Sequence, residues 1–438
     1  MTKKKFTSAD LFSSEFSHFL NYDLTNSENL LGDDYSIKGS GTSIVGAFFS
    51  KTSTVLEVQS KNEIISLDID KKEIVVRPSI TISNLYQVLI PQHLFLTSVP
   101  SYPGVSVGGC IAADVHGQNH VKEGCFSNNV KSLMLYHPDK GLIECSDDKN
   151  KDIFDLTLGG YGATGIIQEV KLRLISIKTN LLNLKTVTFS TLFEAFQLME
   201  EESNNYDYLH SWCDMSSANP IKQKGIVSLG SYALGDKIKK YNIHKKNGNV
   251  HLPILINLFG TKFMFIVNKL YYFINITKHK KMILLHDFIF PSRSNLFYFS
   301  MFGKKGVIEH QVLIPKQKAK RYLEDMMKII DINSPVISLC HLKVFSGNGS
   351  LLRFDGTGYC LAIHLYNNSS GIKALKAIDK IDLYYGCKVN LVKDSRIGIA
   401  SINQQYSEAS LFRSKIRNYD PLIKFRNNIV NKVFDINE

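Results

Sequence analysis

Three glycine-rich stretches in the first half of the chain have residue types and spacing that suit a phosphate-bearing ligand. They are residues 37–46, 103–117 and 158–167, and the second of them carries a single histidine, His116. Glycine permits left-handed backbone conformations and close approach of another group, and successive N–H groups in such turns form a concave anion site. One such stretch is explained equally well as a turn between strands. Three in this order, each attached to predicted β structure, favour a large polyanionic cofactor.

The length and charge of the chain limit the classes of protein to which it can belong. At 438 residues it is too long for one ordinary core, so we expect two domains. Its net charge of +12 favours an anionic partner, which is nucleic acid, an acidic bilayer surface or a phosphorylated substrate. Lysines cluster at 3–5, 237–246 and 278–281, but no zinc-finger, RNA-recognition or basic-zipper pattern accompanies them. These clusters are therefore interpreted as solvated faces, and nucleic acid is not the expected partner.

Cysteine usage and apolar stretches indicate the compartment. The seven cysteines are scattered without a Cys-x-x-Cys pair, which argues against a disulfide framework or a metal site and for reduced thiols. The basic N-terminus lacks an apolar segment, so no signal peptide is expected. Residues 252–276 are interrupted by polar and charged residues, whereas a spanning helix needs about 20 nearly uninterrupted apolar ones. We expect a cytoplasmic protein, with 252–285 as aromatic-rich structure in a core or at the inner face of the membrane.

Apolar periodicity predicts mostly β structure in the first half. The spacing of Leu11, Phe12, Phe16, Phe19 and Leu20 predicts an amphipathic helix over 7–20. We expect strands at 54–58 and 167–174, a hairpin over 64–77, and a helix that begins at Ser83 and stops at Pro91.

The second half alternates strands with helices. A helix is expected after Ser190, and a helical tail over 405–438. Strands are predicted at 206–213, 225–232, 283–289, 307–314, 336–345 and 359–366, and further helices at 316–330 and 372–385. This pattern predicts an α+β domain, in which an antiparallel sheet carries helices on one face.

The three glycine motifs together resemble those of the vanillyl-alcohol-oxidase-type, or PCMH-type, FAD-binding oxidoreductases. Gly39-Ser40-Gly41-Thr42-Ser43 resembles their G-x-G-x-S pyrophosphate loop. Residues 103–117 resemble PG-x-x-VGG-x-x-A-x-x-x-HG, and residues 159–166 resemble the GG-x-G-x-x-GI that closes their FAD domain. The resemblance implies a two-domain fold, with an FAD-binding domain over 1–178 and 388–438 and a substrate domain over 179–387.

Within this superfamily the chain resembles the decaprenylphosphoryl-β-D-ribose 2′-oxidase family. The matching stretches are residues 113–120, 126–132 and 392–396, with scattered likeness at 311–315, 343–345 and 359–360. The resemblance implies oxidation of the C2′ hydroxyl of a polyprenyl-phosphate-linked ribofuranose to the 2′-keto sugar. It further implies a separate short-chain reductase partner, which would complete an epimerisation to arabinofuranose for cell-wall or surface polysaccharide synthesis.

The same resemblance assigns roles to individual residues. Lys393 would contact flavin and substrate and take part in proton transfer, and His116 would lie at the flavin edge. Lys343, Gln311 and Cys360 would contact the substrate, although a strand residue and a core thiol are the ordinary alternatives for the last two. The predicted FAD contacts are Ile37, Gly39, Ser40, Gly41, Thr42, Ser43, Ile44, Val45, Gly46, Ser106, Val107, Gly108, Gly109, Ala113, Asp114, Val115, His116, Gly165, Ile166, Asn390 and Lys393.

Departures from the family pattern bear on the cofactor and the sugar. Thr42 stands where aldonolactone oxidases carry the histidine that bonds to the flavin, so we expect non-covalent FAD. A thioether to Cys125 is the disfavoured alternative. Gly358 and Glu309 replace an Asn and a Gln of the family, which leaves open another lipid-linked or nucleotide-linked furanose.

Two other functions compete with this interpretation. One is a soluble sugar-lactone or alditol oxidase of the same superfamily, against which Thr42 and the missing C-terminal His-Trp-x-Lys signature count. The other is a non-catalytic protein that binds a membrane surface or a polyanion, which leaves the three glycine stretches unexplained.

Overall fold

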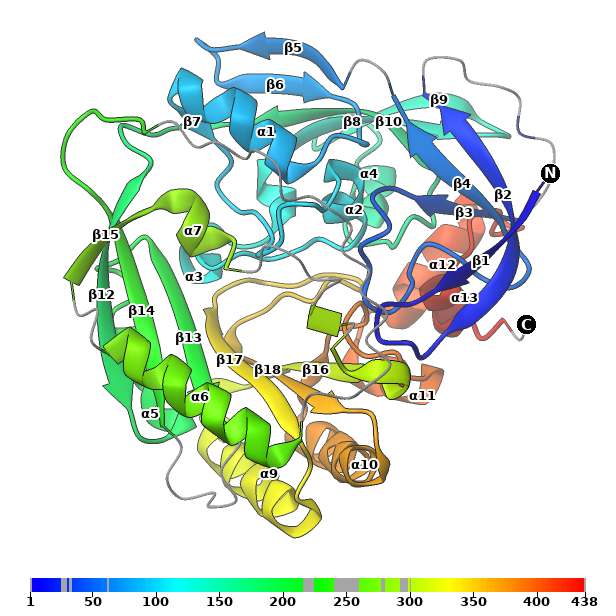
Figure 1. Cartoon of the computed structure of the whole chain (residues 1–438). Helices are drawn as coiled ribbons and strands as arrows, with labels where there is room; N and C mark the ends of the chain where they lie inside the picture. Colours follow the sequence, from blue (N-terminus) through cyan, green and yellow to red (C-terminus); the bar gives the residue numbers. More distant parts are fainter. Residues whose placement is uncertain are drawn as a thin grey trace.

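The computed structural model describes residues 2–24, 30, 34–60, 63–215, 224–239, 260–276, 280–291, 298–299 and 301–436, and its elements are labelled in Figure 1. Helices and antiparallel sheets are both present, so the predicted α+β class is confirmed. None of the helices in these ranges is long and apolar enough to cross a membrane.

A small mixed sheet begins the chain. It has the order β1-β2-β4-β3, with β1 (Thr2–Thr7), β2 (Ser14–Asp23), β3 (Tyr35–Lys38) and β4 (Thr54–Gln59). The helix predicted over 7–20 is wrong, because a hairpin turn interrupts that segment. Asp10 accepts hydrogen bonds from Ser8 and from the Phe12 N–H, and Leu11 has a left-handed backbone. Local side-chain bonding of this kind competes with helix formation.

A second, antiparallel sheet follows in the order β5-β6-β10-β8-β9. Its strands are β5 (Ile64–Asp68), β6 (Glu73–Val76), β8 (Val130–His137), β9 (Gly141–Ser146) and β10 (Ile166–Arg173). Short elements surround it, namely α1 (Ile82–Leu89), η1 (Ile90–Gln92), β7 (Leu94–Phe95), α2 (Val107–Ala112), α3 (His120–Glu123), η2 (Phe126–Asn129), α4 (Lys151–Thr157) and β11 (Ile175–Ser176). The α1 cap is Thr81 rather than Ser83, since the Thr81 hydroxyl accepts from the Asn84 N–H.

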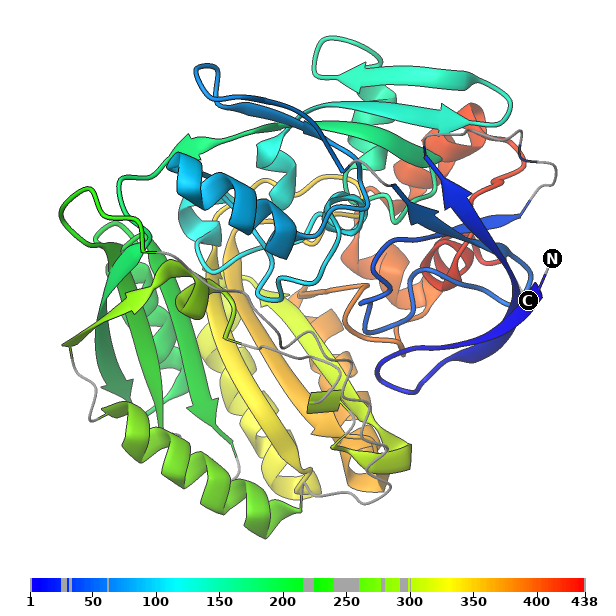
Figure 2. The same cartoon turned by 45° about the horizontal axis from the view of Figure 1, so that its top comes forward.

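Two four-stranded antiparallel sheets make up the second half. One, in the order β13-β14-β12-β15, holds β12 (Leu181–Phe189), β13 (Tyr208–Asp214), β14 (Lys224–Tyr232) and β15 (Lys280–Leu284). The other, in the order β17-β18-β16-β19, holds β16 (Val307–Ile314), β17 (Ile337–Phe345), β18 (Gly358–Tyr366) and β19 (Lys388–Val389). Figures 1 and 2 show β13 beside β17, where Ser211 bonds both to the Leu342 carbonyl and to the Leu342 N–H.

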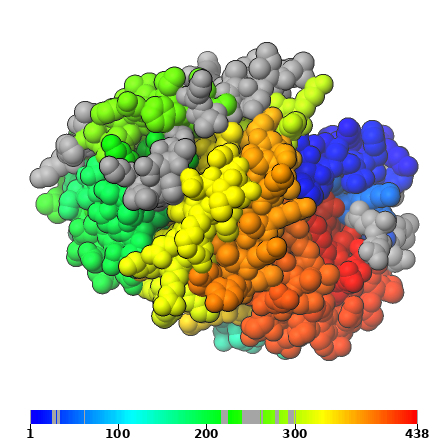
Figure 3. Space-filling model, turned by 90° about the horizontal axis from the view of Figure 1, so that it is seen from below, coloured from blue at the N-terminus to red at the C-terminus, as the bar shows by residue number. Residues whose placement is uncertain are grey.

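Helices cover the outer face of these two sheets. The helices α5 (Leu192–Glu201), α9 (Ala319–Asn333) and α10 (Ser369–Tyr385) share one apolar core with the strands. Figure 3 shows α9 and α10 side by side on the outer surface. The helix α6 (Thr261–Ile276) lies on the other side of β13, with Tyr271 4.7 Å from Trp212 between ring centres. Short 3₁₀ turns, η3 (Gly303–Lys305) and η4 (Lys316–Lys318), flank β16.

Two predicted boundaries in this half need correction. The strand predicted over 283–289 ends at Leu284 and continues as α7 (Leu285–Ile289). The cap of α5 is Thr191 rather than Ser190, because the Thr191 hydroxyl accepts from the Glu194 N–H while Glu194 accepts from the Ser190 N–H. The Thr191 cap fixes the helix start one residue later than predicted.

The C-terminal tail returns to the first half. It forms α11 (Ile399–Gln405), α12 (Ala409–Tyr419) and α13 (Asn428–Phe434), in agreement with the helical tail predicted over 405–438. Phe425 bridges to Tyr35, and the Asn427 side chain donates to the Tyr161 carbonyl. The domain boundaries at 178/179 and 387/388 remain a prediction.

Candidate active site

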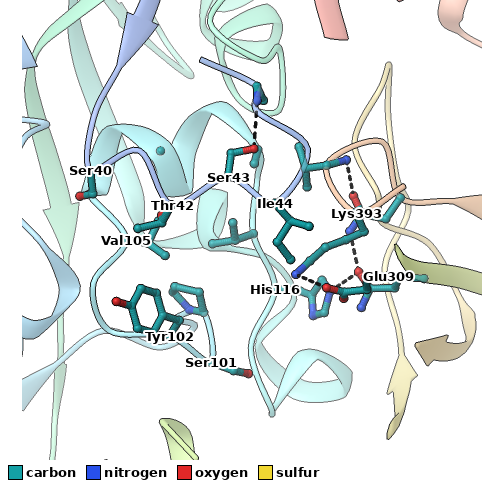
Figure 4. Close-up of a pocket in the computed structure, with 18 of the residues that line it drawn as sticks. Ser40, Thr42, Ser43, Ile44, Ser101, Tyr102, Val105, His116, Glu309 and Lys393 are labelled. Atoms are coloured by element: carbon teal, nitrogen blue, oxygen red, sulfur yellow. Dashed lines mark hydrogen bonds and ion pairs between the residues drawn. The ribbon is translucent and has the colours of Figure 1, made fainter. Parts of the chain in front are cut away.

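A cavity of about 740 Å³ lies between the glycine-rich stretches of the first half and the inner face of the second-half sheets. One wall holds residues 39–44 and parts of 100–118, and the other holds side chains of β13, β16, β17 and α6. In Figure 4, Ser40, Thr42, Ser43 and Ile44 follow one another along the first wall, and Lys393, Glu309 and His116 lie together at its end. Each of the three stretches noted in the sequence reaches this one cavity.

Backbone geometry explains why glycines line the first wall. Gly41, Gly162 and Gly165 have φ values of 67°, 82° and 130°, which side-chain-bearing residues rarely adopt. A Cβ on Gly39 would come within 2.3 Å of the Ser106 hydroxyl, and one on Gly165 within 2.5 Å of the Tyr136 carbonyl oxygen. The wall therefore consists of exposed backbone, which a narrow anionic group can approach closely.

The second glycine-rich stretch, residues 103–117, contains a short helix. Ser106 caps the short helix α2 and accepts a hydrogen bond from the Gly109 N–H, so a helix begins at Val107. Gly108 lies against Pro78, where a Cβ would meet the proline ring at 2.9 Å. The chain then passes Ala113 and Asp114 to His116 along the cavity.

Most of the predicted FAD contacts line this cavity. The exceptions are Val45, Gly46, Val107 and Ile166, which lie behind the wall; Val45, Val107 and Ile166 are part of apolar clusters. The carboxylate of Asp114 is bonded to the Ser127 N–H and hydroxyl, so it supports the wall rather than facing a ligand.

Two buried polar atoms in the wall fit a ligand with hydrogen-bonding groups. The Ser79 hydroxyl oxygen and the Gln118 side-chain carbonyl oxygen line the cavity and lack a hydrogen-bond partner among the residues that the structure describes. Buried polar atoms in native proteins are nearly always paired, so these two indicate a bound group. Together with the glycine wall they fit FAD, which would lie along residues 39–44, Gly108, Gly109 and Gly165.

A directed hydrogen-bond chain crosses the cavity near His116. The Asn390 side-chain amide donates to Gln311 Oε1 at 2.6 Å, and His116 Nε2 lies 3.4 Å from the same oxygen. Lys343 Nζ is 3.2 Å from His116 Nδ1. Burial lowers the pKa of His116 well below its usual value, and the Lys343 charge adds to this effect. Burial also lowers the pKa of Lys343, to about 8. His116, Gln311 and Lys343, three of the predicted site residues, thus form one network.

Lys393, a fourth predicted site residue, forms an ion pair with a carboxylate. Its Nζ lies 3.3 Å from Glu309 Oε2, and His364 Nε2 lies 3.4 Å from the same oxygen. Burial would raise the pKa of Glu309, but Lys393, His364 and His341 outweigh it and hold the pKa well below its usual value. The cavity therefore contains a buried carboxylate that stays ionised.

The segment that carries Lys393 is anchored from behind. His310 follows Glu309 on β16 and points to the opposite face, where its Nδ1 is 2.9 Å from Asp394 and its Nε2 is 3.1 Å from Asp382. Burial alone would lower the pKa of His310, yet the two carboxylates raise it to about 10. Arg396 joins Asp394 to Asp379 of α10, and Ser395 donates to Asp10.

Cys360 faces the same side of the sheet as Lys343, its neighbour on β17, but it does not reach the cavity. It is fully buried in a cluster with Leu313, Phe345 and Phe354, and burial raises the pKa of its thiol to about 12. All seven cysteines are free and buried. Cys125 is likewise absent from the cavity wall.

Sequence reasoning missed several cavity residues of the second half. They are His210 and Trp212 on β13, His341 on β17, His364 on β18, Tyr298, and Met264, Asn268 and Tyr271 on α6. A usable signal is the polar pair at i and i+2 on an apolar strand, as in His341 and Lys343 or Glu309 and Gln311. Such residues lie on one face of a strand. The sequence did not show which strands direct the face with the polar pair toward the same cavity.

A known protein family matches the part of the chain that contains residues 39–44 and 100–118 of the first wall. Residues 31–146 match the family described as FAD binding domain. The chain carries an FAD-binding domain. It is 24% identical over 380 residues to decaprenylphosphoryl-beta-D-ribose oxidase of Mycolicibacterium smegmatis, covering 84% of this chain and 82% of that protein. The predicted resemblance is thereby confirmed, and the chain is an FAD-dependent oxidoreductase.

Other relatives match over a shorter part of the chain. L-gulonolactone oxidase of Mus musculus is 27% identical over 28% of this chain and 27% of its own length. L-galactono-1,4-lactone dehydrogenase 1 of Oryza sativa is 31% identical over 31% of this chain and 23% of its own length. The likeness to these lactone-acting proteins is therefore limited to about a third of the chain.

Proposed function

We propose that this oxidoreductase oxidises the 2′-hydroxyl of a ribofuranose linked to a polyprenyl phosphate, giving the 2′-keto sugar. The observation that carries the proposal is a cavity in which the glycine wall faces the network of Lys343, His116 and Gln311, with the Lys393–Glu309 pair in the same cavity. When bound, FAD supplies the two-electron oxidant, while the protein orients the sugar and handles its proton. The long match to the ribose oxidase, as against the short matches to lactone-acting proteins, favours this substrate.

The cavity offers complementary groups for such a sugar. The two lysines can donate hydrogen bonds to a furanose or its phosphate, and the ionised carboxylate of Glu309 can accept them from furanose hydroxyls. Trp212 and Tyr271 line the same cavity and give an apolar surface for the carbon atoms of the ligand. Sites that bind small molecules combine such apolar surfaces with a few placed polar groups.

The helix α6 suits a substrate that carries a lipid. Met264 and Asn268 face the cavity and are buried, whereas Ile266, Leu270 and Phe273 are 64%, 60% and 52% exposed. An exposed apolar face of this kind, with Lys269 beside it, fits the surface of an anionic bilayer. We expect the protein to bind such a bilayer peripherally and to pass its keto product to a separate short-chain reductase that completes the epimerisation.

The test is the spectrum of the flavin in the purified protein. We expect a two-banded yellow spectrum, which anaerobic addition of a short-chain prenylphosphoryl-β-D-ribofuranose bleaches. The arabinose epimer and L-gulonolactone are the controls and should leave the spectrum unchanged. A different result would contradict the proposal, namely anaerobic bleaching by the lactone but not by the prenylphosphoribose, with stoichiometric hydrogen peroxide when the lactone is oxidised in air. The protein would then be a soluble lactone or alditol oxidase.

The bilayer contact has a separate test. Wild-type protein should float with vesicles that contain phosphatidylglycerol, and Leu270→Asp should float less. Ile332→Asp is the matched control, since Ile332 is 80% exposed on another helix, α9. Equal flotation of the wild type and Leu270→Asp would contradict the α6 contact.

A further inference from the structure

The two lysines of the cavity differ in the groups that they contact. Lys393 donates to the carboxylate of Glu309, whereas the partner of Lys343 is the ring nitrogen Nδ1 of His116. Both lysines line the cavity, and Lys343 is 5% exposed. A neighbouring carboxylate favours the charged form of a lysine, whereas burial without such a partner favours the neutral amine. The two side chains are therefore suited to different tasks.

The hydrogen-bond chain sets the direction of each bond around His116. Because the Asn390 amide donates to Gln311 Oε1, that oxygen is an acceptor, and His116 Nε2 must carry a proton to bond to it. Nδ1 of the neutral ring then holds a lone pair, which accepts from Lys343 Nζ. A neutral lysine amine that donates one N–H to His116 keeps its own lone pair for another group.

Oxidation of a secondary alcohol requires such a lone pair. The C–H and O–H bonds of the carbinol both break as C=O forms, so a hydride and a proton must leave. FAD is the hydride acceptor, and the proton needs a protein group. We propose that Lys343 is the catalytic base that takes the hydroxyl proton, becoming an ammonium, with His116 as the residue that positions it. This inference rests on the proposed oxidation of a sugar hydroxyl.

The other cavity groups are poorer acceptors. Glu309 is a weak base because its pKa is held low by its cationic neighbours, and burial lowers the pKa of His210 to about 4. The pKa of His341 is also well below its usual value, for the same reason. His364 uses Nδ1 to bond Tyr298 and has Nε2 beside Glu309.

The charges that face Lys343 agree with a base that works near neutral pH. Burial lowers its pKa most, Lys393 lowers it further, and Cys360, Glu309 and Cys125 oppose them. The neutral rings of His116, His210 and His341 complete its surroundings. With a pKa of about 8, about a quarter of the molecules hold the neutral amine at pH 7.5.

The first experiment is competitive acetylation of the FAD-loaded protein with acetic anhydride across pH 6–11, read for each lysine by peptide mass spectrometry. Lys343 should titrate near pH 8, and its modification should be blocked in a parallel sample by bound substrate. Lys388, a half-buried lysine of β19 that lies outside the cavity, is the internal reference for accessibility. A Lys343 midpoint above pH 10 would overturn the proposal without any substrate being used.

The second experiment is anaerobic flavin reduction followed by stopped flow as a function of pH. The wild-type rate should fall below about pH 8, and Lys343→Met should reduce flavin about 10²–10⁴-fold more slowly while keeping its flavin spectrum. Ethylamine should restore part of the rate to Lys343→Ala, and Lys388→Met should retain the wild-type profile. A Lys343→Met enzyme with the wild-type rate and acidic limb would refute the role. If prenylphosphoribose does not reduce the wild-type flavin, the proposed substrate fails, and the acetylation result still decides for or against Lys343.

Discussion

Replacing His310 with Gln should destabilise the protein strongly near neutral pH and less in alkali. The rise of the His310 pKa from 6.5 to about 10 corresponds to roughly 5 kcal/mol. Removing one partner of a buried ion pair costs about 3–5 kcal/mol, because the remaining charge is left uncompensated. Asp382 and Asp394 are both almost fully buried, so water does not replace the imidazolium. We therefore expect His310→Gln to lower the free energy of unfolding by about 3–5 kcal/mol at pH 6.

The pH dependence follows from the direction of the shift. A group whose pKa is raised on folding stabilises the protein fully below its unfolded value, here 6.5, and this stabilisation is lost as the pH rises through about 10. Urea unfolding of wild type and His310→Gln at several pH values should show the difference shrinking by about 1.4 kcal/mol per pH unit between pH 7 and 9.5. FAD should also dissociate faster from the variant, since Asn390 and Lys393 lie on the segment that His310 anchors.

A double variant separates lost charge from lost packing. Asp394 keeps its ion pair with Arg396 in His310→Gln, whereas Asp382 loses the imidazolium. His310→Gln combined with Asp382→Asn removes that uncompensated carboxylate, so it should recover part of the stability lost in the single variant. A loss below about 1 kcal/mol at pH 6, or a difference that is constant from pH 6 to 10, would refute the assignment of His310 as a buried cation.

Three further predictions concern the cofactor and the cavity. Gly165→Ala should abolish FAD retention and lower the melting temperature, because a Cβ would meet the Tyr136 carbonyl at 2.5 Å and φ is 130°; Gly398→Ala, where a Cβ meets nothing within 4 Å, is the control. Acid precipitation should leave the flavin in the supernatant, since Thr42 cannot form a covalent link, and a yellow pellet would contradict this. Glu309→Gln should move the acidic limb of flavin reduction to lower pH, because Glu309 raises the pKa of Lys343; an unmoved limb in the same stopped-flow assay would show that the two groups are not coupled.

The sequence was sufficient where local properties decide structure. The glycine stretches could be recognised because their backbone conformations and close approaches exclude larger residues, as at Gly41 and Gly165. Five of the six strands predicted in the second half were found within two residues, because runs of apolar residues mark them. The strand β12 was not predicted, and the strand predicted over 283–289 ends at Leu284. The helix predicted over 7–20 was wrong, although the apolar spacing of this segment fits a helix. The Asp10 carboxylate accepts a hydrogen bond from the Phe12 N–H and stabilises a hairpin turn instead.

Contacts between distant segments lay beyond such reasoning. The Lys393–Glu309 pair and the Asp394–His310 pair join positions 84 residues apart. Nothing in the local pattern says that β16 and the 390–396 segment meet. The motif that contains Lys393 could be recognised from the sequence, but the different roles of its residues could not. Lys393 faces the cavity, while Asp394 and Arg396 face away and hold the segment to α10.

The strand β16 shows how one register serves both purposes. Its neighbours Glu309 and Gln311 face the cavity, and His310 between them faces the buried carboxylates. Successive side chains of a strand point to opposite faces, so a slip of one residue would turn His310 into the cavity and bring Glu309 against Asp382 and Asp394. Three carboxylates would then share a dry space without a cation from β16, which is strongly unfavourable. The ion pairs behind the sheet therefore select the register that sets Glu309 opposite His364, and with it the order of charged groups along the cavity.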